Sequence, residues 1–346
     1  MQVGGRILGK GAYGCTLDPP PRCLGKEMSS ASLVGKVVAE EHEDVEREVA
    51  IGVKIMALST LSSKYFAVPT EECEPILSLQ DTNAQDCSII RKALKKANDR
   101  GTPTRLSMML MPMAGEIFNK WVSNIDKSYG LYEKTFVHLL EGMVLYQRAG
   151  YIHNDIHGAN ILVDSQNVAR YIDFGRSFHI KEVRSLDTVH LGKSFAPSYT
   201  MYSPELHLIE ALMDGISPEH GIVSLVHAQY TYYDALAHHF LRPDVRTMRN
   251  WKPLLTLFHT MDDTDINMKT KRILEFVRTY AKLFDSWRIG ILMWVPWYDF
   301  LRHGKVMNPV LRGVLDGLTK FDVRDRWTAE KALGVLSPSN PILAQV

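Results

Sequence analysis

The sequence predicts an α+β protein with a strand-rich first lobe and a helix-rich second lobe. Short apolar runs separated by turn residues fill the first third of the chain, whereas longer segments with apolar residues at helical spacing dominate the remainder. The character changes near Ala114 and Gly115, so we expect the lobes to span residues 1–113 and 114–346. A length of 346 residues agrees with two domains at about 150 residues each.

The composition is that of an ordinary globular protein and excludes several partner classes. Hydrophobic residues make up 45% of the chain, which suffices for a sizeable core. Forty basic and thirty-nine acidic residues give a net charge of +1, so no strong overall field attracts nucleic acid or an anionic membrane. The longest strongly apolar stretch, Ile289–Tyr298, is about half of a membrane span, and the N-terminus lacks a signal-peptide core. We expect a cytoplasmic protein without nucleic-acid or membrane partners.

The four cysteines lie in the first quarter of the chain, at Cys15, Cys23, Cys73 and Cys87. They form no C-x-x-C pair, and four cysteines in a chain of 346 residues do not make a disulfide scaffold. A structural metal site is conceivable, but the spacings do not match those of zinc sites. We therefore expect reduced thiols.

The first lobe is predicted to alternate strands with one long helix. Val3–Leu8 and Ser32–Val38 are short apolar runs, and the turn signal Asp18–Pro21 lies between them. Glu40–Leu58 carries apolar residues every three or four positions and acids on the other face, which predicts an amphipathic helix. Met108–Met113 is a buried apolar run that closes the lobe.

The second lobe begins with a helix and a hairpin. Tyr132–Gly150 has apolar residues at helical spacing and ends at a glycine, which is a common C-terminal cap. Ile161–Val163 and Val168–Ile172 are β-like runs joined by a polar turn. Beyond Ser203 the sequence is mostly helical.

Three polar residues around this hairpin suggest phosphoryl transfer. Asp155 and Asn160 flank one loop, and Asp173 follows the hairpin. A hairpin that folds back beside the loop would bring all three groups to one point. Carboxylate and amide oxygens bind Mg²⁺, and transfer from ATP requires metal, rigid positioning and an acceptor for the nucleophile's proton.

With these motifs in view, the chain resembles the protein kinase superfamily. Gly9–Gly14 matches the glycine-rich loop, Lys36 the strand lysine, His153–Asn160 the catalytic loop and Asp173–Gly175 the D-F-G motif. Three later matches follow in the family's order: Ser203–Glu205 for A-P-E, Asp285–Gly290 for the D-x-W-S-x-G helix start, and Asp325–Ala329 for the arginine that pairs with the A-P-E glutamate. The resemblance implies a bilobal protein-kinase-like fold, with a small antiparallel β lobe and a large helical lobe.

The resemblance also implies roles for individual residues. Asp155 accepts or orients the proton of the substrate hydroxyl, whereas Asn160 and Asp173 bind Mg²⁺, with Mn²⁺ as an alternative. Lys36 contacts the α and β phosphates of ATP. The phosphates are covered by Gly9, Lys10, Gly11, Ala12, Tyr13 and Gly14, and adenine hydrogen-bonds the backbone near Met111 and Met113.

One glutamate of the predicted helix should pair with Lys36 and hold it on the phosphates. The acidic run Glu40–Glu48 is mostly a solvated face. Glu48 lies three residues after Val45, on the buried edge of the helix, and is therefore favoured. Glu41 is the second choice.

Two departures from the family pattern bear on substrate and regulation. Asn154 replaces the arginine that pairs with a phosphate on the activation loop in the family, so we expect activity that does not depend on such a phosphate. His157 stands where Ser/Thr kinases carry a lysine that touches the γ-phosphate. The loop thus also resembles the D-L-H-x-x-N loop of aminoglycoside and choline kinases.

Two insertions make the chain longer than the family pattern, one at about 71–105 and one at about 206–284. The first carries Cys73, Cys87 and the basic run Arg91–Lys96, which is expected to be a solvated face. The second is expected to be mainly helical. The run Gly9–Cys15 followed by Pro19–Cys23, together with Tyr65, Phe66 and Cys73, resembles divergent kinases of large eukaryotic DNA viruses, the iridovirus-like group. That resemblance would place the protein in the host cytoplasm or the virion.

The function predicted from the sequence is transfer of the γ-phosphate of ATP to Ser/Thr hydroxyls of a protein substrate. The presence of A-P-E-like and glycine-rich motifs and the 27 residues between Gly175 and Ser203 favour a protein substrate. Two alternatives remain: a small-molecule phosphotransferase similar to aminoglycoside and choline kinases, and a nucleotide-binding pseudokinase scaffold. The substrate's identity and the oligomeric state stay open.

Overall fold

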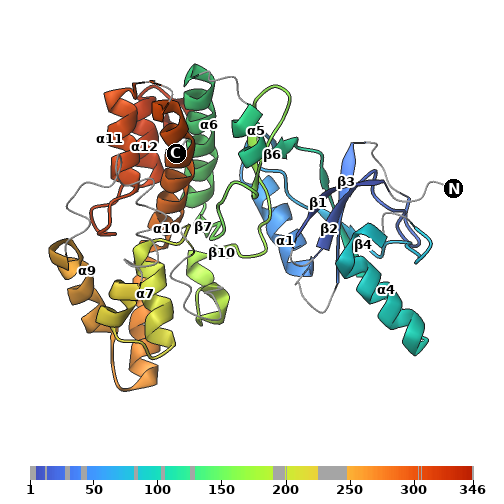
Figure 1. The fold of residues 1–346 in the computed structure, drawn as a ribbon, viewed down its shortest axis with the longest axis horizontal. Helices are drawn as coiled ribbons and strands as arrows, with labels where there is room; N and C mark the ends of the chain where they lie inside the picture. The colour runs from blue at the N-terminus through green and yellow to red at the C-terminus, as the bar shows by residue number, and fades with distance from the viewer. Residues whose placement is uncertain are drawn as a thin grey trace. The chain divides into compact units, whose positions relative to one another are not determined.

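The chain forms two compact units in a computed structural model (Figure 1). The first unit consists of Met1–Glu116 and Leu162–Gly175, and the second of Ile117–Ile161 and Arg176–Val346. The structure describes residues 5–11, 14–27, 32–39, 45–81, 85–102, 106–124, 129–189, 199, 201–224, 248–302, 304 and 306–344.

The first unit is built on a five-stranded antiparallel sheet of order β1-β2-β3-β5-β4. The strands are β1 (Arg6–Lys10), β2 (Gly14–Asp18), β3 (Leu33–Ala39), β4 (Glu71–Cys73) and β5 (Leu106–Pro112). The central strands bury apolar side chains completely, as Leu17, Val37 and Met108 show. This burial of β-branched and long apolar residues stabilises the sheet.

Helices pack against this sheet. The helix predicted over Glu40–Leu58 is α1 (Val45–Met56), whose buried face includes Val45, Glu48 and Ile55. The short helix α2 (Ser62–Tyr65) follows it. Helix α4 (Ser88–Arg100) packs against β2 and β3 through Ile90 and Leu94 (Figure 1).

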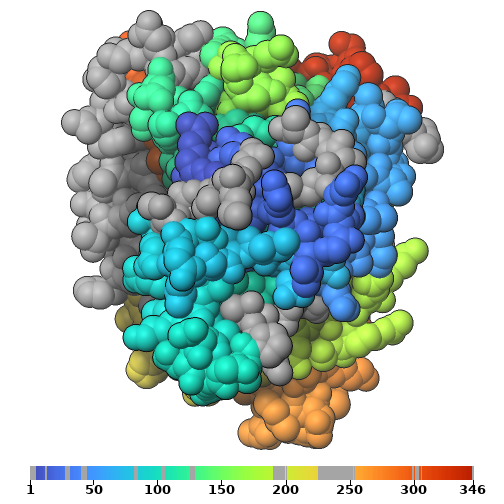
Figure 2. Space-filling model, turned by 90° about the vertical axis from the view of Figure 1, so that its right-hand side faces the viewer, coloured from blue at the N-terminus to red at the C-terminus, as the bar shows by residue number. Residues whose placement is uncertain are grey.

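The predicted insertion at about 71–105 therefore contributes a strand and a helix to the first unit. Its first three residues form β4, which pairs with β5 as the edge strand of the sheet. Its helix α4 presents Arg91, Lys92, Lys95 and Lys96 to solvent, as expected for a solvated basic face. The residues of β4 and α4, cyan and teal in Figure 2, lie at the surface in that view.

The expectation of reduced thiols is wrong, because all four cysteines are paired in the structure. Cys15 of β2 bonds to Cys87, the residue that precedes α4, and Cys23 bonds to Cys73 of β4. Spacing along the chain gave no sign of this, since the partners are 72 and 50 residues apart and only the folded sheet brings them together. Within the described residues, no group of three or more His, Cys, Asp and Glu side chains could hold a metal ion.

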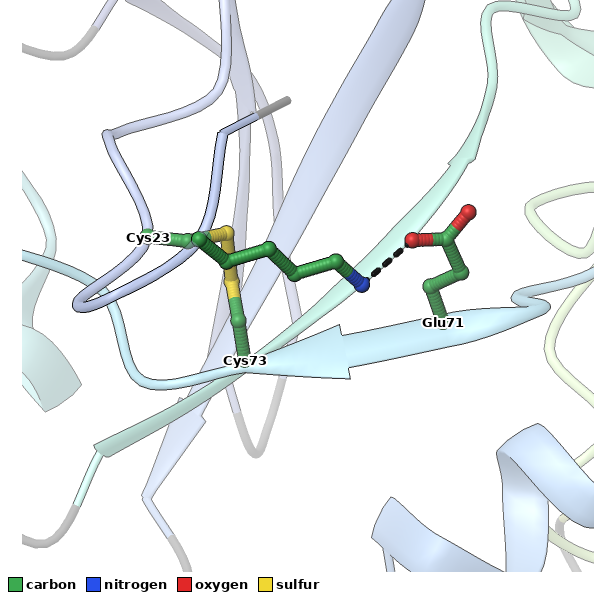
Figure 3. The surroundings of a disulfide bond; sticks show 4 residues. Cys23, Glu71 and Cys73 are labelled. Atoms are coloured by element: carbon green, nitrogen blue, oxygen red, sulfur yellow. Dashed lines mark hydrogen bonds and ion pairs between the residues drawn. A yellow bond between two sulfur atoms is a disulfide. The ribbon is translucent and has the colours of Figure 1, made fainter. Parts of the chain in front are cut away.

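Both bonds tie the segment that contains β2 and its continuation to Cys23 to the predicted insertion. The second lies beside Glu71, which pairs with Lys26 at 2.5 Å (Figure 3). Backbone hydrogen bonds from Leu24 N to Glu74 O and from Ile76 N to Arg22 O, both 2.8 Å, complete the junction.

The second unit is mainly helical. Its helices are α5 (Phe118–Asn124), α6 (Tyr129–Arg148), α7 (Pro204–Met213), α9 (Met248–Met261), α10 (Ile266–Arg302), α11 (Pro309–Leu318), α12 (Ala329–Leu336) and α13 (Pro341–Ala344). Helices α6, α12, α11 and α10 lie side by side in that order (Figure 1). Helix α6 ends before Gly150, whose φ of 86° suits the glycine cap predicted there.

Helix α10 differs from the prediction. The motif Asp285–Gly290 was expected to start a helix, but the helix begins at Ile266 and continues through the motif for 37 residues in total. The reason lies in its apolar face, because Ile273, Val277 and Phe284 extend the buried stripe upstream of the motif. The predicted insertion 206–284 is mainly helical where it is described, as expected.

Short strands connect these elements. The predicted hairpin is present as β8 (Ile161–Val163) and β9 (Ala169–Tyr171), in a sheet of order β6-β8-β9 with β6 (Glu116–Ile117). Strands β7 (Tyr151–Ile152) and β10 (Phe178–His179) pair antiparallel, and the 3₁₀ turns Ile180–Glu182 and Asp187–Val189 follow. None of the helices in the described parts of the chain is long and apolar enough to cross a membrane.

Candidate active site

A lysine and two carboxylates meet in the first unit. Lys36 lies in the middle of β3, between Thr16 of β2 and Met109 of β5 in the register of the sheet. Its Nζ is 3.1 Å from Oε2 of Glu48 and 3.3 Å from Oδ1 of Asp173. The structure thus contains the Lys36–Glu48 pair favoured from the sequence, whereas Glu41 lies outside the described residues.

Burial differs between the two carboxylates. The Glu48 side chain is completely buried, whereas that of Asp173 is 40% exposed. A buried carboxylate needs a cation or hydrogen bonds to offset its lost hydration, and Lys36 supplies that charge. The exposed carboxylate of Asp173 keeps access to solvent and to ligands.

The backbone around Asp173 is held in an uncommon conformation. Asp173 has a φ of 62°, which costs free energy for a residue other than glycine. Arg47 of α1 donates from Nη1 to the carbonyl of Gly175 at 3.1 Å, and the fully buried ring of Phe174 meets Phe66 edge-on at 6.0 Å. These contacts fix the turn on which the Asp173 carboxylate is presented.

The glycine-rich segment is the end of the β1–β2 hairpin. Gly11 N donates to Gly14 O at 2.8 Å, and Ala12 and Tyr13 lie outside the described residues. A side chain at Gly14 would meet the backbone oxygen of Val37, 2.2 Å from the added Cβ, so close packing requires that glycine. At Gly9 the described part of the chain leaves an added Cβ unobstructed. Packing therefore does not explain Gly9, and Lys10 beside it is exposed.

The predicted adenine site has fewer free donors than expected. Met111 lies opposite Val34 within the sheet, and Pro112 has no N–H. The N–H of Met113 already donates to the carbonyl of Ser32 at 3.1 Å. Adenine recognition at this segment would therefore rely on carbonyl oxygens or on exchange of the Met113–Ser32 bond.

The loop after β7 holds the second set of predicted residues, in the second unit. Asn160 donates from Nδ2 to the backbone oxygen of Asp155 at 3.0 Å and to its Oδ2 at 3.2 Å. These bonds leave Oδ1 of Asn160, an oxygen suited to a hard cation, outside them. The Asp155 side chain is 20% exposed, so it can meet a substrate hydroxyl.

His157 belongs to the same loop. Its Nδ1 accepts the N–H of Ala159 at 3.2 Å, and its Nε2 lies 3.8 Å from Oδ2 of Asp155. An acceptor role for Nδ1 places the proton of the neutral ring on Nε2, on the side of Asp155. This histidine thus presents an N–H to the carboxylate where a lysine would present a permanent charge.

The start of the loop is anchored by a buried carboxylate. Asp285 of α10 accepts the backbone N–H groups of His153 and Asn154 at 2.7 and 3.0 Å. Asn154 has a φ of 61°, which these bonds hold in place. Burial raises the pKa of Asp285, although Arg288 and the two N–H groups oppose the shift.

Several residues near Asp155 were not found from the sequence. Arg176 donates to the hydroxyl of Tyr202 at 2.9 Å. Burial alone would lower the pKa of Arg176, but the interactions with Tyr202 and Asp155 outweigh it, so the pKa is raised. Desolvation and the charge of Asp155 raise the pKa of Tyr199 to about 12, so its hydroxyl stays protonated. For Arg288 a signal existed, because it stands where the resembling motif has serine.

A second predicted pair is also present. Both terminal nitrogens of Arg326 reach the Glu205 carboxylate, with Nη2 at 2.9 Å from Oε2, and both side chains are completely buried. This is the pair expected between the late arginine and the A-P-E-like glutamate. It fixes α7 to the segment before α12.

Comparison with known proteins gives a local similarity to protein kinases. Over 92 residues, 25% of this chain, the sequence is 34% identical to mitogen-activated protein kinase kinase kinase 3 of Arabidopsis thaliana. It is 33% identical to mitogen-activated protein kinase kinase kinase 2 of the same plant over an equal length. The match covers 14% of the length of each relative. No protein family model matches the chain.

Proposed function

We propose that this protein is an ATP-dependent protein kinase of the kinase-like bilobal fold, which phosphorylates Ser/Thr hydroxyls. The observation that carries the proposal is the cluster of Lys36, Glu48 and Asp173, whose outer members are 137 positions apart in the sequence. An amine between one buried and one exposed carboxylate suits binding of phosphate beside a metal ion. The local similarity to two plant protein kinases supports the same reaction.

In this proposal the second unit supplies the group that meets the nucleophile. The bond between the γ-phosphorus and the bridging oxygen of ATP breaks, and a bond to the substrate hydroxyl oxygen forms. The hydroxyl proton passes to Asp155, whose Oδ2 is held by Asn160 at 3.2 Å. That contact leaves the other carboxylate oxygen, Oδ1, for the hydroxyl.

In this proposal each unit contributes an oxygen donor that suits a divalent cation. Asp173 offers an exposed carboxylate, and Asn160 offers the amide oxygen that its own hydrogen bonds do not use. Hard oxygen donors of this kind are the ligands that Mg²⁺ and Mn²⁺ prefer. When bound there, the ion would neutralise charge on the phosphates. Lys36 would contact the α and β phosphates, and Gly9 would allow their close approach.

A second candidate function rests on His157. Its Nε2 lies 3.8 Å from Asp155, where a protein kinase of the resembling type has lysine. This favours transfer to a small molecule with a hydroxyl, of the aminoglycoside or choline type. The resemblance to kinases of large DNA viruses and the cytoplasmic location both stay predictions.

The test is transfer of labelled γ-phosphate with Mg²⁺ or Mn²⁺ to two panels, one of proteins and peptides and one of aminoglycosides and choline. Wild type is compared with Asp155→Asn and with the matched control Asp99→Asn, which changes an exposed residue of α4. Phosphoamino-acid analysis identifies the acceptor residue.

Phosphoserine or phosphothreonine formed by wild type and Asp99→Asn, and absent with Asp155→Asn, is the expected result. Label in the small molecules alone would establish the second candidate. Equal transfer by Asp155→Asn and wild type would contradict the mechanism. Binding of ATP without turnover on either panel would favour the pseudokinase scaffold.

A further inference from the structure

The side chain of Asn154 links the catalytic loop to two other segments. Its Nδ2 donates to the backbone oxygen of Val189 at 2.6 Å, and its Oδ1 accepts from Nη1 of Arg288 at 3.1 Å. Asn154 is 1% exposed, so both bonds are shielded from water. An amide can serve a donor and an acceptor at once, which an arginine at this position could not do.

Arg288 of α10 is as deeply buried as Asn154. Its counter-charge is internal, because Nη1 also lies 3.4 Å from Oδ1 of Asp285, the carboxylate that holds the loop backbone. The other terminal nitrogen, Nη2, has no hydrogen-bond partner in the described part of the chain. The guanidinium carbon lies 5.2 Å from the centre of the Tyr202 ring, a cation–π contact.

Tyr202 connects Arg288 to Arg176, the residue that follows Gly175. Its hydroxyl accepts from Arg176 at 2.9 Å, and the Arg176 guanidinium lies 5.9 Å from the same ring. The contact between Arg176 and Tyr202 therefore joins the beginning of segment 176–202 to its end. Arg288 contacts the same ring from α10. Asn154 joins the middle of the segment, at Val189, to the catalytic loop.

We propose that Arg288 is a positioning residue which, through Asn154 and Tyr202, holds the catalytic loop, Val189 and the Arg176–Tyr202 contact in their working arrangement without a phosphate group. The guanidinium that the resembling family places in the catalytic loop is here supplied by α10, at a position where that motif has serine. The inference rests on the proposed kinase function.

The electrostatics favour this assignment. A buried guanidinium requires a nearby negative charge, and Asp285 provides it within the same helix. A phosphate is then not needed to neutralise Arg288. Because Asp285 offsets the charge of Arg288 within the chain itself, the unphosphorylated protein should be active. This gives a structural reason for the independence from phosphorylation that the Asn154 substitution suggested.

The test compares wild type with Arg288→Gln, Arg288→Lys and the control Arg312→Gln, whose side chain on α11 is 57% exposed. Phosphatase-treated protein is checked by intact mass before kcat and KM for ATP are measured. Amide hydrogen exchange over 186–189 and 201–203 is measured without nucleotide, as a readout that does not depend on activity. Asn154→Ala serves as a second variant, because it removes the link without leaving a buried charge unpaired.

We expect phosphatase-treated wild type to keep its kcat. In Arg288→Gln the kcat should fall about tenfold to a hundredfold, the size of one or two hydrogen bonds to a charged group, with KM for ATP almost unchanged. Exchange in both segments should become faster. Arg288→Lys should recover part of the loss, Asn154→Ala should resemble Arg288→Gln, and Arg312→Gln should match wild type.

Loss of kcat on phosphatase treatment of wild type would overturn the inference. So would a folded Arg288→Gln or Asn154→Ala protein with wild-type kcat and exchange. If wild type transfers no phosphate at all, the proposed function fails, but the exchange comparison still decides whether Arg288 positions the two segments.

Discussion

The two units fix their candidate catalytic residues by different means. In the first unit, Lys36 is shared between two carboxylates, and one of them, Asp173, is 40% exposed. The framework around it is reinforced by two disulfide bonds. In the second unit, Asp155 and Asn160 sit on a loop whose start is held by the completely buried carboxylate of Asp285.

This difference predicts how substitutions affect the stability and activity of each unit. Exposed charge pairs contribute little stability because solvent screens them, whereas buried charges destabilise strongly when one partner is removed. We therefore expect substitutions of the completely buried charges of the second unit to destabilise it, and substitution of Lys36 to affect activity first.

Glu205→Gln should produce the largest loss of stability. It leaves Arg326 as a buried charge without its counter-charge, which costs about 3–5 kcal/mol. Urea unfolding measures the change. The matched control is Glu330→Gln, whose carboxylate pairs with Arg148 at 2.6 Å but is 51% exposed, and which should cost about 1 kcal/mol at most. Equal effects of the two variants would contradict the contrast between buried and exposed pairs.

Lys36→Met should lower kcat about a hundredfold to a thousandfold, equivalent to about 3–4 kcal/mol. It removes the cation that contacts both Glu48 and Asp173. Labelled-phosphate transfer gives the rate, and Lys92→Met on the exposed face of α4 is the control. A Lys36→Met protein with wild-type kcat would show that the cluster has no part in transfer.

Removal of the Cys15–Cys87 bond should destabilise the first unit by about 3–4 kcal/mol, since the bond closes a loop of about seventy residues in the unfolded chain. Urea unfolding of Cys15→Ser/Cys87→Ser, with and without a reducing agent, measures this. Thiol titration of denatured wild type should find no free thiol. Four free thiols in protein prepared without reductant would contradict the pairing seen here.

Acid should weaken the second unit through His207. Burial lowers the pKa of this histidine to about 4, below its ordinary value of 6.5. Between these values the unfolded chain binds a proton that the folded chain does not, so stability is full above pH 6.5 and decreases as the pH falls toward 4. The total is about 3 kcal/mol.

Unfolding by urea at pH 7.5 and pH 4.5 measures this effect. In His207→Gln the difference between the two pH values should shrink by most of that amount, whereas the exposed His220→Gln should behave as wild type. An unchanged pH dependence in His207→Gln would rule out His207 as its source.

The smallest effect is expected at the ion pair beside the Cys23–Cys73 bond. Lys26 and Glu71 are 44% and 43% exposed, so Lys26→Ala should change stability by less than about 1 kcal/mol. A double-mutant cycle with Glu71→Ala isolates the pair. A coupling above about 2 kcal/mol would show that this junction behaves like the buried pairs of the second unit.

Much of the local structure was predictable, because the patterns that specify it are local. A short apolar run predicted the strand that carries Lys36. Helical periodicity identified Glu48 as the acid on the buried edge of α1. Glu205 and Arg326 were paired through the family resemblance. In each case a short motif identified both the residue and the element on which it lies.

What the sequence did not reveal depends on contacts between distant segments. The partners of Cys15 and Cys23 are specified by the sheet and not by spacing. The upstream extension of α10 follows from packing of Ile273, Val277 and Phe284 in the core of the second unit. The bond between Arg288 and Asn154, 134 positions apart, joins two departures from one motif set whose connection becomes visible only in three dimensions.

The most direct test of the central claim measures ATP affinity and phosphate transfer on the same preparation of Asp155→Asn. In the proposed reaction the first unit binds the phosphates and Asp155 meets the nucleophile. We therefore expect ATP affinity close to that of wild type and a kcat lowered at least a hundredfold, within the range of a lost general base. Transfer at the wild-type rate with unchanged ATP affinity would contradict the claim.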